Sequence, residues 1–153
     1  MAIGVFPGSF NPPTVAHLTI AEAAVAQCGL DRVDLVLSHD ALGKDDADLV
    51  PITHRAAVLD AVARSRSWLG VVVTERRLIV DIAEGYDVVV VGADKWAQVI
   101  DQAWYGDDSE ARDAVLRRFP TVAGVPRPGA ELVGVDVVLD VHEDHRAISA
   151  TGA

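Results

Sequence analysis

The chain has 153 residues and a formal net charge of −10 at pH 7, from 13 basic and 23 acidic side chains. Half of the residues are hydrophobic, which excludes a low-complexity disordered chain, and the length fits one domain over 1–153. The acidic balance argues against a nucleic-acid partner, and it means that any anionic ligand needs a local, pre-organised site.

Strand-like and helix-like segments alternate along the whole chain. Short runs rich in β-branched residues predict strands, and apolar residues at helical spacing predict helices. The four valines within Asp87–Val91 suit a strand covered on both faces. In chain order we expect strand Ala2–Phe6, helix Thr14–Cys28, strand Val33–Leu37, loop Ser38–Leu49, helix Thr53–Arg66, strand Gly70–Thr74, helix Arg76–Glu84, strand Asp87–Val91, helices Ala93–Ile100 and Ser109–Phe119, strand Thr121–Val125 and a last strand within Glu131–Val141.

This alternation predicts an α/β fold, namely a Rossmann-like, doubly wound parallel sheet of five to six strands with helices on both faces. Ligands of such sheets bind beyond the carboxyl ends of the strands, where the strand order reverses. We therefore expect the chemistry just after Phe6, Leu37, Val91 and Val141.

The sequence also bears on the setting in which the protein works. Its longest apolar stretches are far shorter than a membrane span. The first residues lack the basic region of a signal peptide. The single cysteine, Cys28, cannot form an internal disulfide. These features predict a cytoplasmic protein without a membrane partner.

The segment from Gly8 to His17 joins the first strand to the first helix. Gly8 allows a ligand to approach the backbone closely. Free amide hydrogens and the positive end of the helix dipole favour an anion at such a junction. Thr14 and His17 are three residues apart, so they share one face of the first turns and could hold phosphate. From these residues alone, a simple helix cap remains the alternative.

The same segment carries a family resemblance. Phe6-Pro7-Gly8-Ser9-Phe10-Asn11-Pro12, followed by Thr14-x-x-His17, resembles the first signature of the cytidylyltransferase-like nucleotidyltransferase superfamily, G-[ST]-F-[DN]-P and then [HT]-x-G-H. Thr14 matches phosphopantetheine adenylyltransferases in particular, and Ala16 stands where the signature has glycine. The resemblance implies that His17 donates a hydrogen bond at the α-phosphate, assisted by Thr14, and that the nucleotide contacts Gly8, Ser9 and Phe10.

Two further segments are similar to nicotinate mononucleotide adenylyltransferases. Gly92-Ala93-Asp94 looks like their Gly-Ala-Asp element, which implies that the nucleotide packs against Gly92 and that Asp94 accepts hydrogen bonds from ribose hydroxyls. Arg127-Pro128-Gly129 looks like their Arg-Pro-Gly turn beside the adenine. Thr53-His54-Arg55 resembles a helix start of the same enzymes, and we interpret Arg55 as a surface or ion-pairing residue.

The remaining matches concern the phosphates. Arg146 to Thr151 is similar to the second signature of the superfamily, I-S-[ST]-T-x-x-R, which implies that Ser149 and Thr151 hold the β- and γ-phosphates, although Ala150 replaces a hydroxyl there. Lys44, in the loop after the second strand, would neutralise an anion. Mg²⁺ would be carried by nucleotide phosphates and water, so we expect no dedicated set of metal ligands.

The resemblance implies adenylyl transfer from ATP to a small phosphate-bearing acceptor, with release of pyrophosphate. Gly92-Ala93-Asp94 favours an acceptor like nicotinate mononucleotide, whereas the first segment favours phosphopantetheine. The stretch that holds the pyridine ring in nicotinate enzymes, Ser/Thr-Tyr-Thr, has no clear match here. Cytidylyl transfer, a catalytically degenerate nucleotide-binding protein and an unrelated doubly wound binding module remain alternatives, and copies of the chain could assemble into a homo-oligomer.

Overall fold

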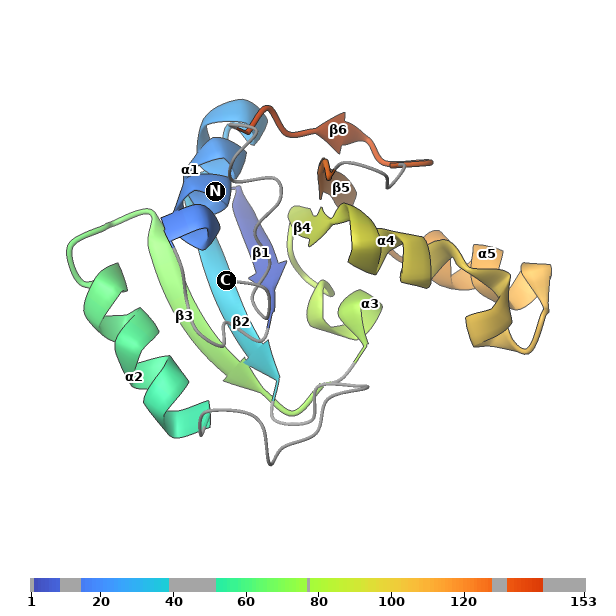
Figure 1. Cartoon of the computed structure of the whole chain (residues 1–153), viewed down its shortest axis with the longest axis horizontal. Coiled ribbons are helices and arrows are strands. Elements are labelled where there is room, and N and C mark those ends of the chain that lie inside the picture. Colours follow the sequence, from blue (N-terminus) through green and yellow to red (C-terminus); the bar gives the residue numbers. More distant parts are fainter. Residues whose placement is uncertain (1, 9–14, 39–51, 77, 128–131, 142–153) are drawn as a thin grey trace.

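A computed structural model describes residues 2–8, 15–38, 52–76, 78–127 and 132–141, with a parallel sheet between two layers of helices (Figure 1). The helices are α1 (Val15–Cys28), α2 (Ile52–Ala63), α3 (Ile79–Ile82), α4 (Ala93–Ile100), the short 3₁₀ helix η2 (Gln102–Tyr105) and α5 (Ser109–Leu116). The strands are β1 (Ile3–Pro7), β2 (Arg32–Ser38), β3 (Leu69–Thr74), β4 (Val88–Gly92), β5 (Thr121–Val125) and β6 (Val137–Val138).

The six strands lie in the order β3-β2-β1-β4-β5-β6, and every neighbouring pair is parallel. This is the strand order of a doubly wound dinucleotide-binding sheet. Strands β2 and β3 are added on one side of β1, and β4, β5 and β6 are added on its other side. The strand order therefore reverses between β1 and β4. The predicted fold class is therefore confirmed, and ligands of such a sheet bind at the carboxyl ends of β1 and β4.

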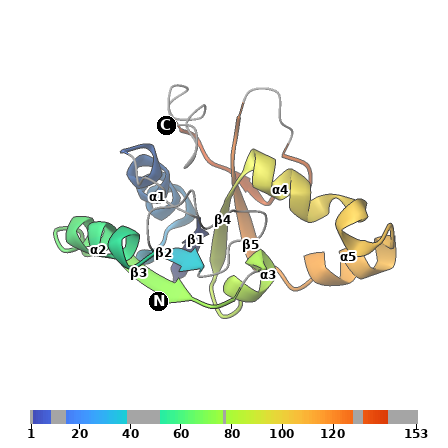
Figure 2. The same ribbon diagram turned by 60° about the horizontal axis from the view of Figure 1, so that its bottom comes forward.

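Helices cover both faces of the sheet, as Figure 2 shows, with α1 and α2 on one side and α3, α4 and α5 on the other. Successive residues of a strand point to opposite faces, so each strand contributes to two cores. In β4, Val88 and Val90 pack in the core beneath α1 and α2, whereas Val89 and Val91 pack with Trp96 on the other face. The valine run thus belongs to a strand buried on both faces, as predicted.

Two predicted elements are shorter than expected. The helix expected over Arg76–Glu84 is only α3 (Ile79–Ile82), because the chain after β3 first makes a local turn in which the Arg76 amide donates to Oγ1 of Thr74, 3.2 Å away. The strand expected within Glu131–Val141 is only β6, and Gly134, with a φ of +79°, makes a turn before it. The other predicted helices and strands agree with the structure to within a few residues, and η2 was not expected.

Candidate functional site

Two glycines mark the point where the strand order reverses. β1 and β4 pair with Val5 opposite Val89, and the same register, continued by three residues, aligns Gly8 with Gly92. The Gly8 amide still donates to the carbonyl of Val36, 3.0 Å away, so the end of β1 stays tied to β2. Among the described residues, a Cβ atom added to Gly92 would meet no atom within 4 Å. The part of the chain that the structure describes thus leaves room for a ligand beside Gly92, and contact of a nucleotide with either glycine stays a prediction.

His17 lies in the first turn of α1, on the side of the sheet that carries the core under α1 and α2. Its side chain is buried, and its ring meets the ring of Phe6 edge-on, with 6.2 Å between the centroids. Burial lowers the pKa of His17 from its ordinary value of 6.5 to about 4, because a charged imidazolium loses its hydration inside the protein. At neutral pH this imidazole is uncharged, so it can donate one hydrogen bond but adds no positive charge.

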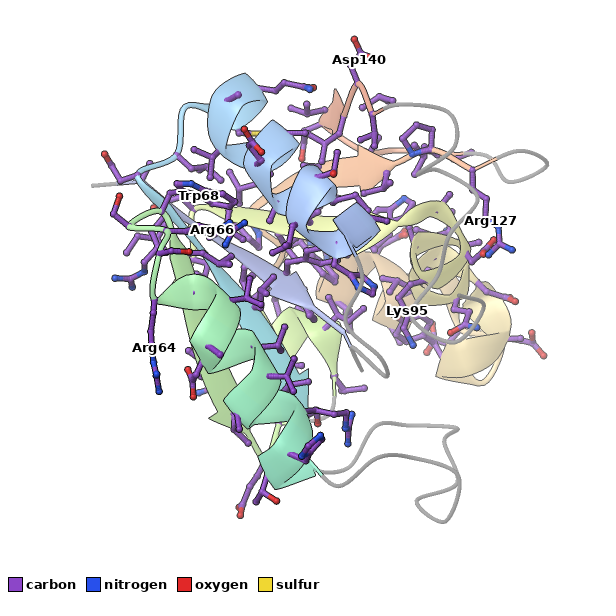
Figure 3. All side chains as sticks on the ribbon, turned by 60° about the vertical axis from the view of Figure 1, so that its left-hand side comes forward. Arg64, Arg66, Trp68, Lys95, Arg127 and Asp140 are labelled. Carbon is purple, nitrogen blue, oxygen red and sulfur yellow. The ribbon has the colours of Figure 1, made fainter. Side chains whose placement is uncertain are left out.

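Asp94 and Arg127 meet at the ends of neighbouring strands. Nη1 of Arg127 donates to Oδ2 of Asp94, and both side chains are about half exposed. Asp94 lies in the first turn of α4, and Arg127 follows β5, so the pair joins two segments 33 residues apart in the chain. Figure 3 shows Arg127 against the start of α4. The sequence indicated both residues separately, but it did not indicate that they contact each other.

α4 itself is held by Trp96, a residue that sequence analysis did not connect with the site. Its indole is buried, donates through Nε1 to the carbonyl of Val133 at 2.6 Å, and packs edge-on against Phe119 at 5.6 Å between ring centroids. The carbonyl belongs to the turn between β5 and β6. This anchor fixes the helix that carries Asp94. The amphipathic pattern of Ala93–Ile100 could have indicated that Trp96 anchors the helix, because the pattern places Ala93 and Trp96 on the buried face.

Arg55 is not a surface residue, which corrects part of our interpretation. It lies in the first turn of α2 and is only 6% exposed. It precedes the core residue Leu59 by one helical turn, so both lie on the face of α2 that packs on the sheet. A residue on the inner face of a helix is buried even when it is charged, and only the packed structure shows which face is inner.

Six predicted site residues lie outside the described parts of the chain: Ser9, Phe10, Thr14, Lys44, Ser149 and Thr151. Of the predicted site residues that are described, Gly8, His17, Gly92 and Asp94 lie near the carboxyl ends of β1 and β4, and Arg127 follows the neighbouring strand β5. Among the described residues, no three His, Cys, Asp or Glu side chains come together in a way that could hold a metal ion. No helix in the same parts of the chain is long and apolar enough to span a membrane.

The strand order defines an α/β protein of the doubly wound class, in which dinucleotides bind where the order reverses. Comparison with known families makes the assignment specific. The model of the "Cytidylyltransferase-like" family matches residues 5–152, so the chain belongs to this family. The resemblance seen in the first signature is thereby confirmed.

Several curated proteins are similar over most of the chain. A probable nicotinate-nucleotide adenylyltransferase from Rhizobium meliloti is 32% identical over 140 residues, which cover 86% of this chain and 72% of that protein. One from Salinibacter ruber is 29% identical over 143 residues, covering 85% and 69%. Among solved structures, the Plasmodium falciparum nicotinic acid mononucleotide adenylyltransferase complexed with NaAD superposes with a TM-score of 0.64 over 97% of this chain and 80% of that one. Its sequence identity is 12%, so this likeness shows the fold alone.

Proposed function

We propose that this protein is an adenylyltransferase that transfers the AMP moiety of ATP to a phosphate-bearing acceptor like nicotinate mononucleotide. The similarity to the Rhizobium meliloti protein, 32% identical over 86% of this chain, carries the proposal. The open backbone at Gly92 and the neighbouring Asp94 support it, because both belong to the segment that resembles nicotinate enzymes. Nucleotide-binding sheets with this strand order use the same edge.

In the proposed reaction, a phosphate oxygen of the acceptor attacks the α-phosphorus of ATP, and pyrophosphate leaves. The attacking phosphate is already anionic, so the protein needs no general base. Its task is to hold two anions in line and to stabilise the charge that develops on the α-phosphate. We assign this stabilisation to His17, whose neutral imidazole donates a hydrogen bond as the charge grows. The backbone at Gly8 and Gly92 would admit the nucleotide, and Asp94 would accept hydrogen bonds from its ribose.

The other assignments rest on the two family signatures. Ser9 and Phe10 would contact the bridging phosphates, and Thr14 would assist His17. Ser149 and Thr151 would hold the β- and γ-phosphates, and Lys44 would neutralise one of them. We assign Mg²⁺ to the triphosphate and water, which suits a cation that keeps several waters and binds through substrate phosphates. When bound, it would neutralise charge on the leaving pyrophosphate.

We infer a cytoplasmic reaction on free nucleotides, because the acidic chain shows the features of neither a nucleic-acid binder nor a membrane protein. Self-association is a separate prediction, and light scattering coupled to size-exclusion chromatography would test it. A homo-oligomer would elute at a multiple of the 16.2 kDa chain mass.

The test is a matrix of nucleoside triphosphates against acceptors, with pyrophosphate release as the readout. ATP and CTP would each be combined with nicotinate mononucleotide, nicotinamide mononucleotide and phosphopantetheine in the presence of Mg²⁺. We expect the fastest release with ATP and nicotinate mononucleotide. Preference for CTP would overturn the adenylyl assignment, and preference for phosphopantetheine would overturn the acceptor. Binding of ATP by calorimetry without any turnover would identify a degenerate nucleotide-binding protein.

A further inference from the structure

The ion pair between Asp94 and Arg127 has a defined place in the sheet. β4 and β5 pair with Gly92 opposite Val125, and each member of the ion pair lies two residues beyond this registered position. The two side chains therefore meet at the carboxyl ends of adjacent strands, beside the glycine that we expect the nucleotide to approach. An ion pair at this position holds together the two segments that would line the nucleoside part of the ligand.

This ion pair contributes little to the stability of the fold. The side chains of Arg127 and Asp94 are 43% and 55% exposed, and exposed ion pairs contribute little to the free energy of unfolding because solvent screens them. Their effect on geometry is larger. A lone carboxylate on the first turn of α4 could adopt several rotamers, whereas the guanidinium holds Oδ2 on the side of β5. Within the described residues, Oδ1 of Asp94 makes no hydrogen bond.

We propose that Arg127 is a positioning residue, which holds Oδ2 of Asp94 so that Oδ1 is presented to the ribose hydroxyls of the nucleotide. The inference rests on the proposed function and revises the role expected for Arg127, from a nucleotide contact to a residue that acts through Asp94. A carboxylate oxygen whose orientation is already set loses less rotamer freedom on binding, so the free energy of binding the ribose is more favourable.

The test compares ATP with 2′,3′-dideoxy-ATP, which lacks both ribose hydroxyls. The measured quantity is the ratio of kcat/KM for the two nucleotides, with nicotinate mononucleotide as the acceptor, and the ratio of their dissociation constants by calorimetry. A general disturbance of the site affects both nucleotides and cancels in this ratio. The variants are Arg127→Ala, Arg127→Lys, Asp94→Ala and the Asp94→Ala/Arg127→Ala double variant.

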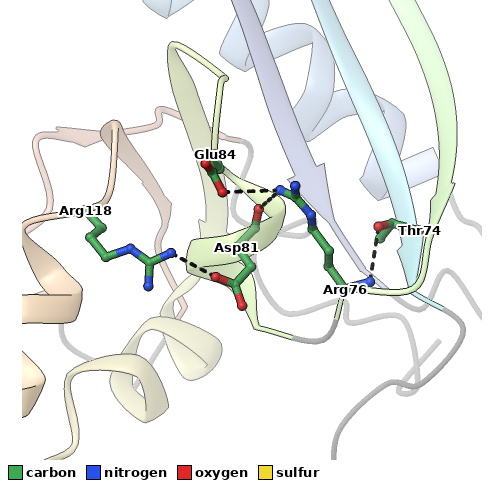
Figure 4. A network of polar contacts seen from close by, with 5 residues as sticks. All are labelled: Thr74, Arg76, Asp81, Glu84 and Arg118. Atoms are coloured by element: carbon green, nitrogen blue, oxygen red, sulfur yellow. Dashed lines mark hydrogen bonds and ion pairs between the residues drawn. The ribbon is translucent and has the colours of Figure 1, made fainter.

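A matched control is available in the pair between Arg118 and Asp81, shown in Figure 4. Nη2 of Arg118 donates to Oδ1 of Asp81 at 2.9 Å, and the side chains are 52% and 38% exposed. This pair also joins two parts of the fold, but it connects the turn after α5 to α3 instead of the ends of β4 and β5. Arg118→Ala removes a similarly exposed Arg–Asp contact without changing Asp94.

We expect the wild-type protein to prefer ATP by about 10- to 100-fold, the range of a hydrogen bond to a charged group. Asp94→Ala should reduce the preference to about 1- to 2-fold, and Arg127→Ala to about 3-fold, by the same reasoning. Arg127→Lys should recover part of the loss, because an ammonium can still pair with Oδ2 but lacks the planar fork. The double variant should resemble Asp94→Ala, since one residue acts through the other, and Arg118→Ala should keep the wild-type ratio.

Three results would overturn the inference. In the first, Arg127→Ala slows both nucleotides equally and leaves the ratio unchanged, which would mean that Arg127 contacts another part of the ligand or only supports the fold. In the second, the wild-type protein binds both nucleotides equally well, which would remove ribose recognition by Asp94 while leaving the proposed transferase intact. In the third, the protein binds no ATP, and then the proposed function fails together with the inference.

Discussion

Acidification should weaken the fold through the buried imidazole of His17. The pKa of this group is lowered by burial from 6.5 to about 4, so the unfolded chain takes up a proton at a higher pH than the folded one. The stabilisation from keeping His17 neutral is therefore complete above pH 6.5 and is lost as the pH falls toward 4. Integrating the proton uptake between about pH 7.5 and about pH 5 gives a loss of about 2 kcal/mol from this residue.

The loss can be measured by urea unfolding at a series of pH values, with the fluorescence of the three tryptophans, which include the buried Trp96, as the signal. His17→Gln removes the titrating group, so its free energy of unfolding should fall by about 2 kcal/mol less than that of the wild type over this range. His54→Gln serves as the control, because His54 is an exposed histidine on α2. Identical pH dependence in the wild type and the His17 variant would refute the reasoning, since burial would then not keep this imidazole neutral.

The other predictions concern activity and packing. His17→Ala should lower turnover by about 100- to 1,000-fold, which corresponds to the loss of about 2.7–4 kcal/mol of transition-state stabilisation. Gly92→Ala should unfold at the wild-type urea concentration, because its new methyl group meets no atom of the described residues, but it should bind ATP more weakly in calorimetry, because the methyl group would occupy space proposed for the nucleotide. Gly70→Ala should lose about 2 kcal/mol of stability in the same urea assay, because its methyl group would overlap Oδ1 of the buried Asp34. Trp96→Phe should cost about 2 kcal/mol, since it leaves a backbone carbonyl without its donor.

The first three of these predictions would be contradicted by the following outcomes. A near-normal rate after His17→Ala would remove the imidazole from the chemistry. Unchanged ATP affinity in the Gly92 variant would place the nucleotide elsewhere. A neutral Gly70 variant would mean that Asp34 can move, although Nε of Arg32 and the Tyr86 hydroxyl hold it at 2.9 and 2.8 Å.

The sequence alone was sufficient to predict the elements, their alternation and the family. Strand periodicity, the valine run of β4 and the glycine-containing segment after β1 are local features, and local features determine where a strand or a helix forms. The first signature also pointed to the segment that begins α1, where the structure places His17. The exceptions were η2, which was not expected, and α3 and β6, where a side-chain hydrogen bond and a left-handed glycine interrupt the pattern.

Only the tertiary structure decided the strand order, the burial of His17 and Arg55, and the contact between Asp94 and Arg127. These properties depend on which distant segments pack together. The sequence pattern around a charged residue in a helix is the same whether that face of the helix contacts solvent or the sheet. Nothing in the sequence indicates that two residues 33 positions apart will form an ion pair. The sequence therefore determined the elements and the chemical groups that they carry, while the packing of the sheet decided which of those groups face one another and which lose their water.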